Sequence, residues 1–200
     1  MTFPLLADSL EGLLDAQGWE KVHLVGHSMG GMVAQEFAVS RQNRLHSLTL
    51  ASTSPAFGSS DGDFQKRFVS ARLGPLDAGK TMSVLAEEIL ENIMAEEVDS
   101  RRRAIAYNCM SVIPGETYRS AIECIVTFEQ RENLPRIFVP TLLIAGEYDK
   151  VAGTGLMKKT ATKISNCQFF ILPSVGHLSY IEDPDGFNAV LDNFLLTVSV

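Results

Sequence analysis

The sequence contains few cysteines. Its 200 residues include three of them, Cys109, Cys124 and Cys167, and no C-x-x-C pair occurs. An odd number of cysteines at wide spacing provides neither a disulfide framework nor a zinc site, and such a pattern is typical of a reducing cytosol. We therefore expect a cytoplasmic protein without a structural metal.

Basic residues are also scarce. The chain has 17 lysines and arginines against 24 aspartates and glutamates, and its net charge is −7. Such a chain offers no basic face to a phosphate backbone, so nucleic acid is not an expected partner. The densest basic run is Arg101–Arg103, which follows Glu96, Glu97 and Asp99. We interpret this run as the solvated surface of a helix.

Long hydrophobic runs are absent as well. No apolar segment approaches the ~20 residues that a membrane-spanning helix needs, so no membrane partner is expected. The opening stretch MTFPLLADSLEGLL has no basic region and contains Asp8 and Glu11, which a signal peptide would not have. The 46% of residues that are hydrophobic suffice for the core of one domain.

The two ends of the chain alternate between strand and helix patterns. Short apolar runs indicate buried strands, and apolar residues three and four positions apart indicate helices. The expected strands are 21–26, 45–51, 140–146 and 167–173, and the expected helices are 5–17, 29–40, 154–164 and one that starts at Asp183–Pro184. This alternation predicts an α/β fold with a parallel, doubly wound sheet.

The middle of the chain breaks this alternation. Residues 52–139 contain no clear strand pattern, and an unstructured loop of that length is uncommon in a compact domain. Helical spacing occurs instead, at 80–97, 99–112 and 116–129. An insertion there would lie over the carboxyl ends of the strands, where ligands bind in such sheets. We therefore assign residues 1–53 and 138–200 to the core and 54–137 to a helical cap or lid.

Residues 24–31 read LVGHSMGG and place Ser28 between Gly26 and Gly30. A G-x-S-x-G spacing between a strand and a helix is the arrangement of a nucleophile elbow. We expect Ser28 to have a strained backbone. We also expect both glycines to be needed, because strand and helix approach too closely for side chains. The alternative is a glycine-rich turn in which the serine caps the helix.

A serine nucleophile needs a histidine that takes up its proton. His23 lies within the first expected strand and His46 begins the second. His27 adjoins the serine and should point away from it in so tight a turn. His177 follows the fourth strand in a loop, which is where a catalytic base belongs in this architecture. We therefore select His177 as the base.

The histidine in turn needs a carboxylate that orients its ring. Asp149 lies in the loop after the third strand and is our candidate. Glu147 is nearer to the strand end and competes with it, whereas Asp183 precedes a proline and suits a helix cap better. Ser28, Asp149 and His177 follow one another in the order that α/β-hydrolases use.

The motifs GHSMGG, GEYD and SVGHLSYIEDP resemble the nucleophile, acid and histidine motifs of the α/β-hydrolase superfamily. The runs LTLASTSPAFG and FEQRENLPRIFVPTLLIAGEYD resemble the branch of 3-oxoadipate enol-lactonases and non-haem haloperoxidase-like esterases. This resemblance implies a helical cap and a nucleophilic Ser28, with Asp149 as the orienting acid and His177 as the base. It also implies that the backbone N–H of Met29 is one oxyanion donor.

The resemblance does not extend to the amino-terminal part of the fold. Members of the branch have several strands before the strand of the elbow, and a HG-type loop that supplies a second oxyanion N–H. Few residues precede 21–26 here, and that loop is missing. We expect the carboxyl-terminal part of a longer hydrolase, as a fragment, a natural truncation or the product of a wrongly assigned start. Its activity would be lowered, and strand 21–26 would become an edge that favours association.

The expected function is hydrolysis of an ester or lactone bond in a small molecule, through an acyl-enzyme and without a cofactor. The alternative is a non-catalytic chain that acts by binding or association. A metal enzyme has little support, because no H-E-x-x-H motif occurs.

Overall fold

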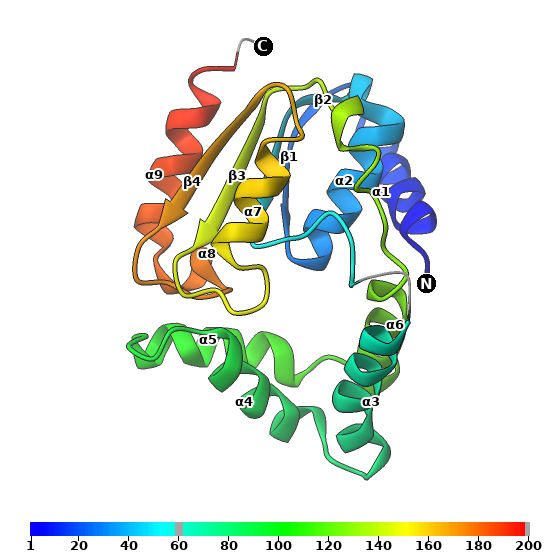
Figure 1. The fold of residues 1–200 in the computed structure, drawn as a ribbon, viewed down its shortest axis with the longest axis vertical. Helices are drawn as coiled ribbons and strands as arrows, with labels where there is room; N and C mark the ends of the chain where they lie inside the picture. Colours follow the sequence, from blue (N-terminus) through cyan, green and yellow to red (C-terminus); the bar gives the residue numbers. More distant parts are fainter. Residues whose placement is uncertain (59–61, 199–200) are drawn as a thin grey trace.

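Four parallel strands form the sheet of this protein, in the spatial order β1-β2-β3-β4 (Figure 1). The computed structural model describes residues 1–58 and 62–198. The strands are β1 (Val22–His27), β2 (Leu45–Ala51), β3 (Thr141–Gly146) and β4 (Cys167–Leu172). Each agrees within one residue at either end with the strand that the sequence predicts.

Helices cover both faces of the sheet. They are α1 (Phe3–Gln17), α2 (Met29–Arg41), α7 (Thr154–Ala161) and α9 (Pro184–Leu195). Leu143 of β3 faces α2 and α7, in a core that includes Phe37 and Met157. Its neighbours Leu142 and Ile144 face α9. Because side chains alternate along a strand, buried β3 contributes to both cores, and the predicted doubly wound α/β fold is confirmed.

The ends of the helices follow local capping groups. Helix α1 begins two residues earlier than predicted, because the side chain of Thr2 accepts the N–H of Leu5 and a proline lies in the first turn. Gly18 ends the helix in the left-handed conformation, as predicted. Asp183 caps α9 by accepting the N–H of Gly186. Helix α7 ends earlier than the predicted residue 164.

Four helices lie between β2 and β3 in the sequence, and we call residues 63–125 the helical segment. They are α3 (Asp63–Asp77), α4 (Met82–Ile93), α5 (Ser100–Ser111) and α6 (Gly115–Ile125). In Figure 1 these green and teal helices lie beyond the carboxyl ends of the strands. The remaining short elements are η1 (Gln42–Arg44), η2 (Leu134–Arg136) and α8 (Ser179–Glu182).

Two features of the helical segment correct the sequence prediction. Helix α3 was not predicted; it contains Gly74 and Pro75, which disfavour a helix, but it packs against α6. The helix predicted at 80–97 ends at Ile93, because Met94 turns into an extended conformation. Arg102 is also not simply solvated, since it donates a hydrogen bond to the backbone carbonyl of Glu182.

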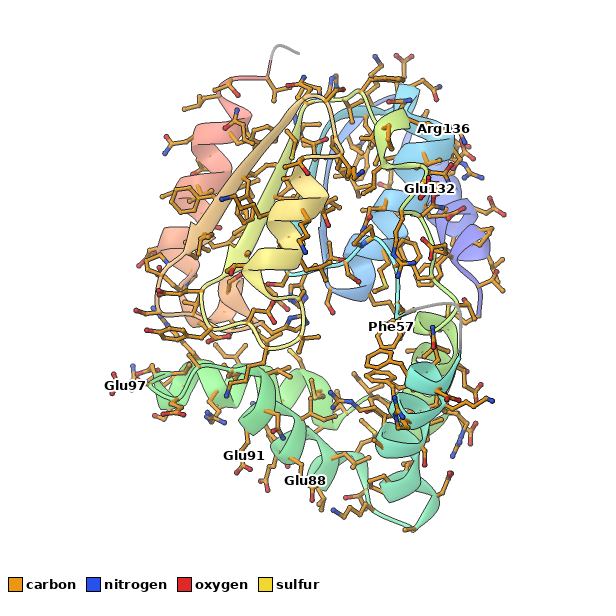
Figure 2. The ribbon with its side chains drawn as sticks, in the orientation of Figure 1. Phe57, Glu88, Glu91, Glu97, Glu132 and Arg136 are labelled. Atoms are coloured by element: carbon orange, nitrogen blue, oxygen red, sulfur yellow. The ribbon has the colours of Figure 1, made fainter. Side chains whose placement is uncertain are left out.

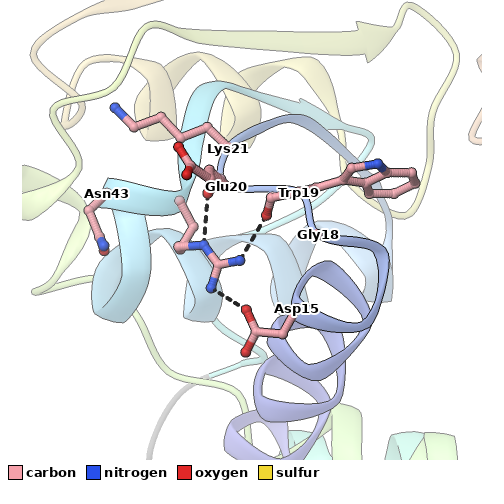
Figure 3. A pocket seen from close by; sticks show the side chains of 7 residues that line it. Asp15, Gly18, Trp19, Glu20, Lys21 and Asn43 are labelled. Atoms are coloured by element: carbon pink, nitrogen blue, oxygen red, sulfur yellow. Dashed lines mark hydrogen bonds and ion pairs between the residues drawn. The ribbon is translucent and has the colours of Figure 1, made fainter.

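Strand β1 lies at one edge of the sheet, as predicted, and Val25 on it is 44% exposed. A surface hollow of about 510 Å³ lies at the amino end of this strand (Figure 3). Arg44 spans the hollow and donates to the carbonyls of Trp19 and Glu20 and to the carboxylate of Asp15. Within the described residues, no helix is both long and apolar enough to cross a membrane.

Candidate active site

Ser28 occupies the sharp turn between β1 and α2. Its φ of 51° and ψ of −119° lie in a region that non-glycine residues rarely adopt. Two hydrogen bonds hold this conformation: the Ser28 N–H donates to the carbonyl of Ala51 at 3.0 Å, and the Thr53 hydroxyl donates to the carbonyl of Ser28 at 2.7 Å. The expected backbone strain is thus present, and Thr53 is a supporting residue that sequence reasoning missed.

The glycines around Ser28 have different roles. A Cβ at Gly26 would lie 2.5 Å from the carbonyl oxygen of Gly30 and 2.8 Å from the Cβ of Ala34. A Cβ at Gly30 would meet no atom within 4 Å, so the prediction that Gly30 is sterically required was wrong. The second close approach is at Gly31, where a Cβ would lie 2.6 Å from the Cβ of Thr53.

Ser28, His177 and Asp149 are brought together by the fold. The Nε2 of His177 lies 2.9 Å from the Ser28 Oγ, and its Nδ1 lies 2.9 Å from the Oδ2 of Asp149. A carboxylate only accepts, so Nδ1 carries the proton and Nε2 is left to accept the serine hydroxyl. His177 and Asp149 are both buried. This is the hydrogen-bonding chain by which a histidine activates a serine.

The loop after β3 stabilises the ionised form of the Asp149 carboxylate. Its Oδ1 accepts the backbone N–H groups of Val151 at 2.7 Å and Ala152 at 2.9 Å. Burial alone would raise the pKa of Asp149. The bond and charge of His177 and the two backbone N–H groups outweigh burial, and they hold this pKa below its usual value.

The two alternative carboxylates lie elsewhere. Glu147 is exposed and accepts the backbone N–H of Ser174 at 2.8 Å. Asp183 caps α9 through a 3.2 Å bond from the N–H of Gly186. The structure therefore places Asp149, and neither alternative, against the ring of His177.

A second carboxylate, which the sequence analysis did not single out, holds the loop that carries His177. Glu182 is 6% exposed and accepts the N–H groups of Gly176 at 2.8 Å and Leu178 at 2.9 Å, one on each side of the histidine. It also accepts the N–H of Ala95 at 2.9 Å, just after α4. The His177 N–H donates to the carbonyl of Ile93 at 2.8 Å. The loop is thus fixed to the end of α4.

His27 lies against the histidine loop, although the sequence analysis set it aside. Its Nε2 donates to the carbonyl of His177 at 2.8 Å, so this nitrogen carries a proton. The ring centroid lies 4.9 Å from those of His177 and Tyr180. Burial, followed by the charge of His177, lowers the pKa of His27 to about 4 despite the bond to the carbonyl.

A cavity of about 470 Å³ opens above Ser28, between the sheet and the helical segment. Most of its lining from the helical segment is apolar, and it includes Phe68, Ile89, Ile93, Met110, Ile122 and Ile125. Phe57 also lines the cavity and points toward the helical segment (Figure 2). Glu88 and Glu91 project from the side of that segment that faces away from the sheet in the same view, and Glu97 lies at its end. None of these three carboxylates lines the cavity.

The described residues contain no cluster of metal-ligating side chains. Across residues 1–58 and 62–198, no group of three or more histidine, cysteine, aspartate or glutamate residues is placed to hold a metal ion. At the floor of the cavity the Ser28 hydroxyl lies against His177, with Asp149 behind the histidine.

The fold and the elbow define an α/β hydrolase. The model of the alpha/beta hydrolase fold family matches residues 1–184, and the chain belongs to this family. The family also explains the order of the motifs along the chain, with the serine first and the histidine last.

Individual relatives carry hydrolase names. The chain is 30% identical over 190 residues to RutD of Stutzerimonas stutzeri, which is named as a carbamate hydrolase, and the match covers 93% of this chain and 70% of the relative. It is 26% identical over 200 residues to 3-oxoadipate enol-lactonase 1 of Acinetobacter baylyi, covering 98% and 72%. A thermophilic esterase from Thermogutta terrifontis has a similar structure, with a TM-score of 0.88 at 27% identity, covering 100% and 74%. The predicted resemblance to the enol-lactonase branch is thereby confirmed.

Proposed function

We propose that this α/β hydrolase cleaves an ester or lactone bond of a small molecule through an acyl-enzyme on Ser28. The observation that carries the proposal is the continuous chain of hydrogen bonds from the Ser28 hydroxyl through His177 to Asp149, at the floor of a largely apolar cavity. The names of the enol-lactonase and esterase relatives support the choice of substrate bond.

In the first half of the reaction, the Ser28 Oγ attacks the carbonyl carbon while its proton moves to the Nε2 of His177. The carbonyl oxygen becomes an oxyanion beside the start of α2. Met29 is the first residue of that helix, so its N–H has no acceptor within the helix and is free to donate to the oxyanion. The tetrahedral intermediate then collapses, and the leaving alkoxide takes the proton from Nε2. In a lactone, this alkoxide stays attached to the acyl group.

In the second half, water replaces the alcohol. His177 removes a proton from the water as it attacks the acyl carbon, and the proton then passes to the Ser28 Oγ as the ester bond to the enzyme breaks. Asp149 keeps the proton of His177 on Nδ1 throughout and stabilises the imidazolium. No step requires a cofactor.

The helical segment has the position of a cap in this proposal. We assign residues 54–137 to the cap and residues 1–53 and 138–200 to the hydrolase core. The apolar lining from α3 to α6 would exclude water from the acyl-enzyme and select the substrate. The contacts of Ile93 and Ala95 with the histidine loop would couple the cap to the base.

The test is covalent labelling with a fluorophosphonate, read by intact mass. We expect one adduct on the unaltered chain and none on Ser28→Ala, because the reagent reacts with an activated serine. Ser52→Ala is the matched control, because Ser52 also lines the cavity and its buried hydroxyl has no hydrogen-bond partner among the described residues. An adduct on Ser28→Ala, or none on the unaltered chain, would contradict the proposal.

A second pair of variants separates the candidate acids. Asp149→Asn should slow labelling by several orders of magnitude, because an asparagine cannot hold the required tautomer of His177. Glu147→Gln should leave the labelling rate unchanged, since the Glu147 side chain bonds to the backbone N–H of Ser174 and not to His177. Equal effects of the two substitutions would remove Asp149 from the proposed mechanism.

A further inference from the structure

The cavity above Ser28 contains one side chain with a permanent charge. Among the described residues that line it, Arg72 of α3 is the only lysine or arginine, and no aspartate or glutamate accompanies it. The other ionisable groups in the lining are His27, His177, Tyr118 and Tyr180. Arg72 is partly buried in this largely apolar lining, and a charged side chain that is partly removed from water usually has a partner.

Arg72 has polar and aromatic neighbours from the helical segment but no counter-ion. It lies beside Tyr118 in the lining of the cavity, and its guanidinium carbon lies 5.5 Å from the ring centroid of Phe68. No carboxylate lies within ion-pair distance of it in the described part of the chain. By contrast, the arginines that pair with carboxylates include Arg41, Arg44, Arg119 and Arg131.

Tyr118 adds a second donor beside Arg72. Burial raises the pKa of the Tyr118 phenol, and the nearby charge of Arg72 offsets only part of this effect. The phenol is therefore protonated at neutral pH. A guanidinium has no acceptor atom, so it does not compete for the phenol O–H, which can donate to a ligand. A guanidinium and a hydroxyl side by side form a typical site for a carboxylate.

A second hollow adjoins this pair. It has a volume of about 530 Å³ and shares Arg72, Phe68 and Tyr118 with the cavity above Ser28. Its wall also contains Glu88, but Glu88 forms an ion pair with Lys80 rather than with Arg72. Arg72 thus lies where the two hollows meet, within reach of a ligand that occupies the inner one.

We propose that Arg72 and Tyr118 bind a carboxylate of the substrate, so that the preferred ester or lactone carries an additional ionised carboxyl group. The apolar walls between this pair and Ser28 would hold the carbon chain that links the carboxylate to the scissile carbonyl. The substrate assignment rests on the function proposed above, whereas binding of a carboxylate to this pair does not.

Binding is tested first, without any catalytic step. Isothermal titration calorimetry would compare 4-phenylbutyrate with 4-phenylbutanamide, which have similar shapes and differ in charge. We expect the carboxylate to bind about tenfold to a hundredfold more tightly, which is the range for hydrogen bonds to a charged group. Arg72→Met should abolish this preference, and Tyr118→Phe, which removes only the hydroxyl, should reduce it.

The matched control is Arg67→Met, which removes an equal charge from an exposed position on the same helix. This variant should keep the full preference for the carboxylate. The proposal is overturned if the unaltered chain binds both ligands equally. It is also overturned if Arg72→Met keeps the preference.

A kinetic comparison tests whether Arg72 and Tyr118 affect the choice of substrate in the reaction. The ratio of kcat/KM for the mono-4-nitrophenyl ester of glutaric acid to that for 4-nitrophenyl butyrate should fall about tenfold to a hundredfold in Arg72→Met and stay constant in Arg67→Met. A constant ratio in Arg72→Met would refute the substrate assignment. If neither ester is cleaved and Ser28 takes no label, the proposed function fails, while the calorimetric result still decides whether the carboxylate binds.

Discussion

Replacing Glu182 with glutamine should destabilise the fold although it changes a single atom of the side chain. The carboxylate of Glu182 is buried and accepts three backbone N–H groups, from Ala95, Gly176 and Leu178. In glutamine one of the two oxygens becomes an NH₂ group, which cannot accept. If the remaining oxygen keeps the bonds from Ala95 and Gly176, the N–H of Leu178 faces another donor.

The magnitude follows from these bonds. A hydrogen bond to a charged acceptor contributes about 1.5–3 kcal/mol, and a neutral bond contributes about 1 kcal/mol. Glutamine thus weakens two bonds and loses the third. A buried amide has a smaller desolvation cost than a buried carboxylate, which offsets part of this loss. We expect the free energy of unfolding to fall by about 3 kcal/mol, a large share of the 5–15 kcal/mol that is usual for a domain.

The assay is urea unfolding at pH 7, followed by far-ultraviolet circular dichroism. Glu97→Gln provides the matched control, because Glu97 is exposed between α4 and α5, at the end of the helical segment (Figure 2). Its free energy of unfolding should change by less than about 0.5 kcal/mol. A loss of less than about 1 kcal/mol in Glu182→Gln would refute the reasoning that the three bonds fix the histidine loop.

Two further predictions concern stability near Ser28. Gly26→Ala should lower the free energy of unfolding by about 3 kcal/mol or more, because its Cβ would lie 2.5 Å from a backbone oxygen. Gly30→Ala should be tolerated, because its Cβ would meet no atom within 4 Å. Equal urea midpoints of the two variants would contradict this prediction. Between pH 6.5 and 4, the unfolded chain takes up a proton on His27 that the folded chain does not, so stability should fall by up to about 3 kcal/mol as the pH decreases. His27→Gln keeps a donor toward the carbonyl of His177 and should remove this part of the pH dependence, and an unchanged slope would rule it out.

The periodic parts of the fold were predictable from the sequence. Strand β3 reads as an uninterrupted apolar run because both of its faces are buried, and α9 shows apolar residues at helical spacing after an Asp-Pro cap. Helix α3 was not predictable in the same way. Its Gly74 and Pro75 argue against a helix locally, and its packing against α6 compensates for them.

The candidate site also has some residues that the sequence predicted and others that it did not. The glycine–serine spacing is a local feature, and together with the chain order of Ser28, Asp149 and His177 it was enough to choose these residues as candidates. It was not enough to choose between Gly30 and Gly31 at the elbow, because that choice depends on where Thr53 lies.

The sequence by itself determined that an α/β sheet carries a serine at a strand–helix turn, because strand and helix periodicities and turn residues act over a few neighbouring positions. Only the tertiary structure decided what surrounds that serine. Glu182 reaches the backbone at the end of α4, His27 reaches the histidine loop, and Arg72 reaches the cavity, all through contacts between segments that are distant in the chain. Such contacts depend on how helices and loops pack in three dimensions, and no local pattern encodes them.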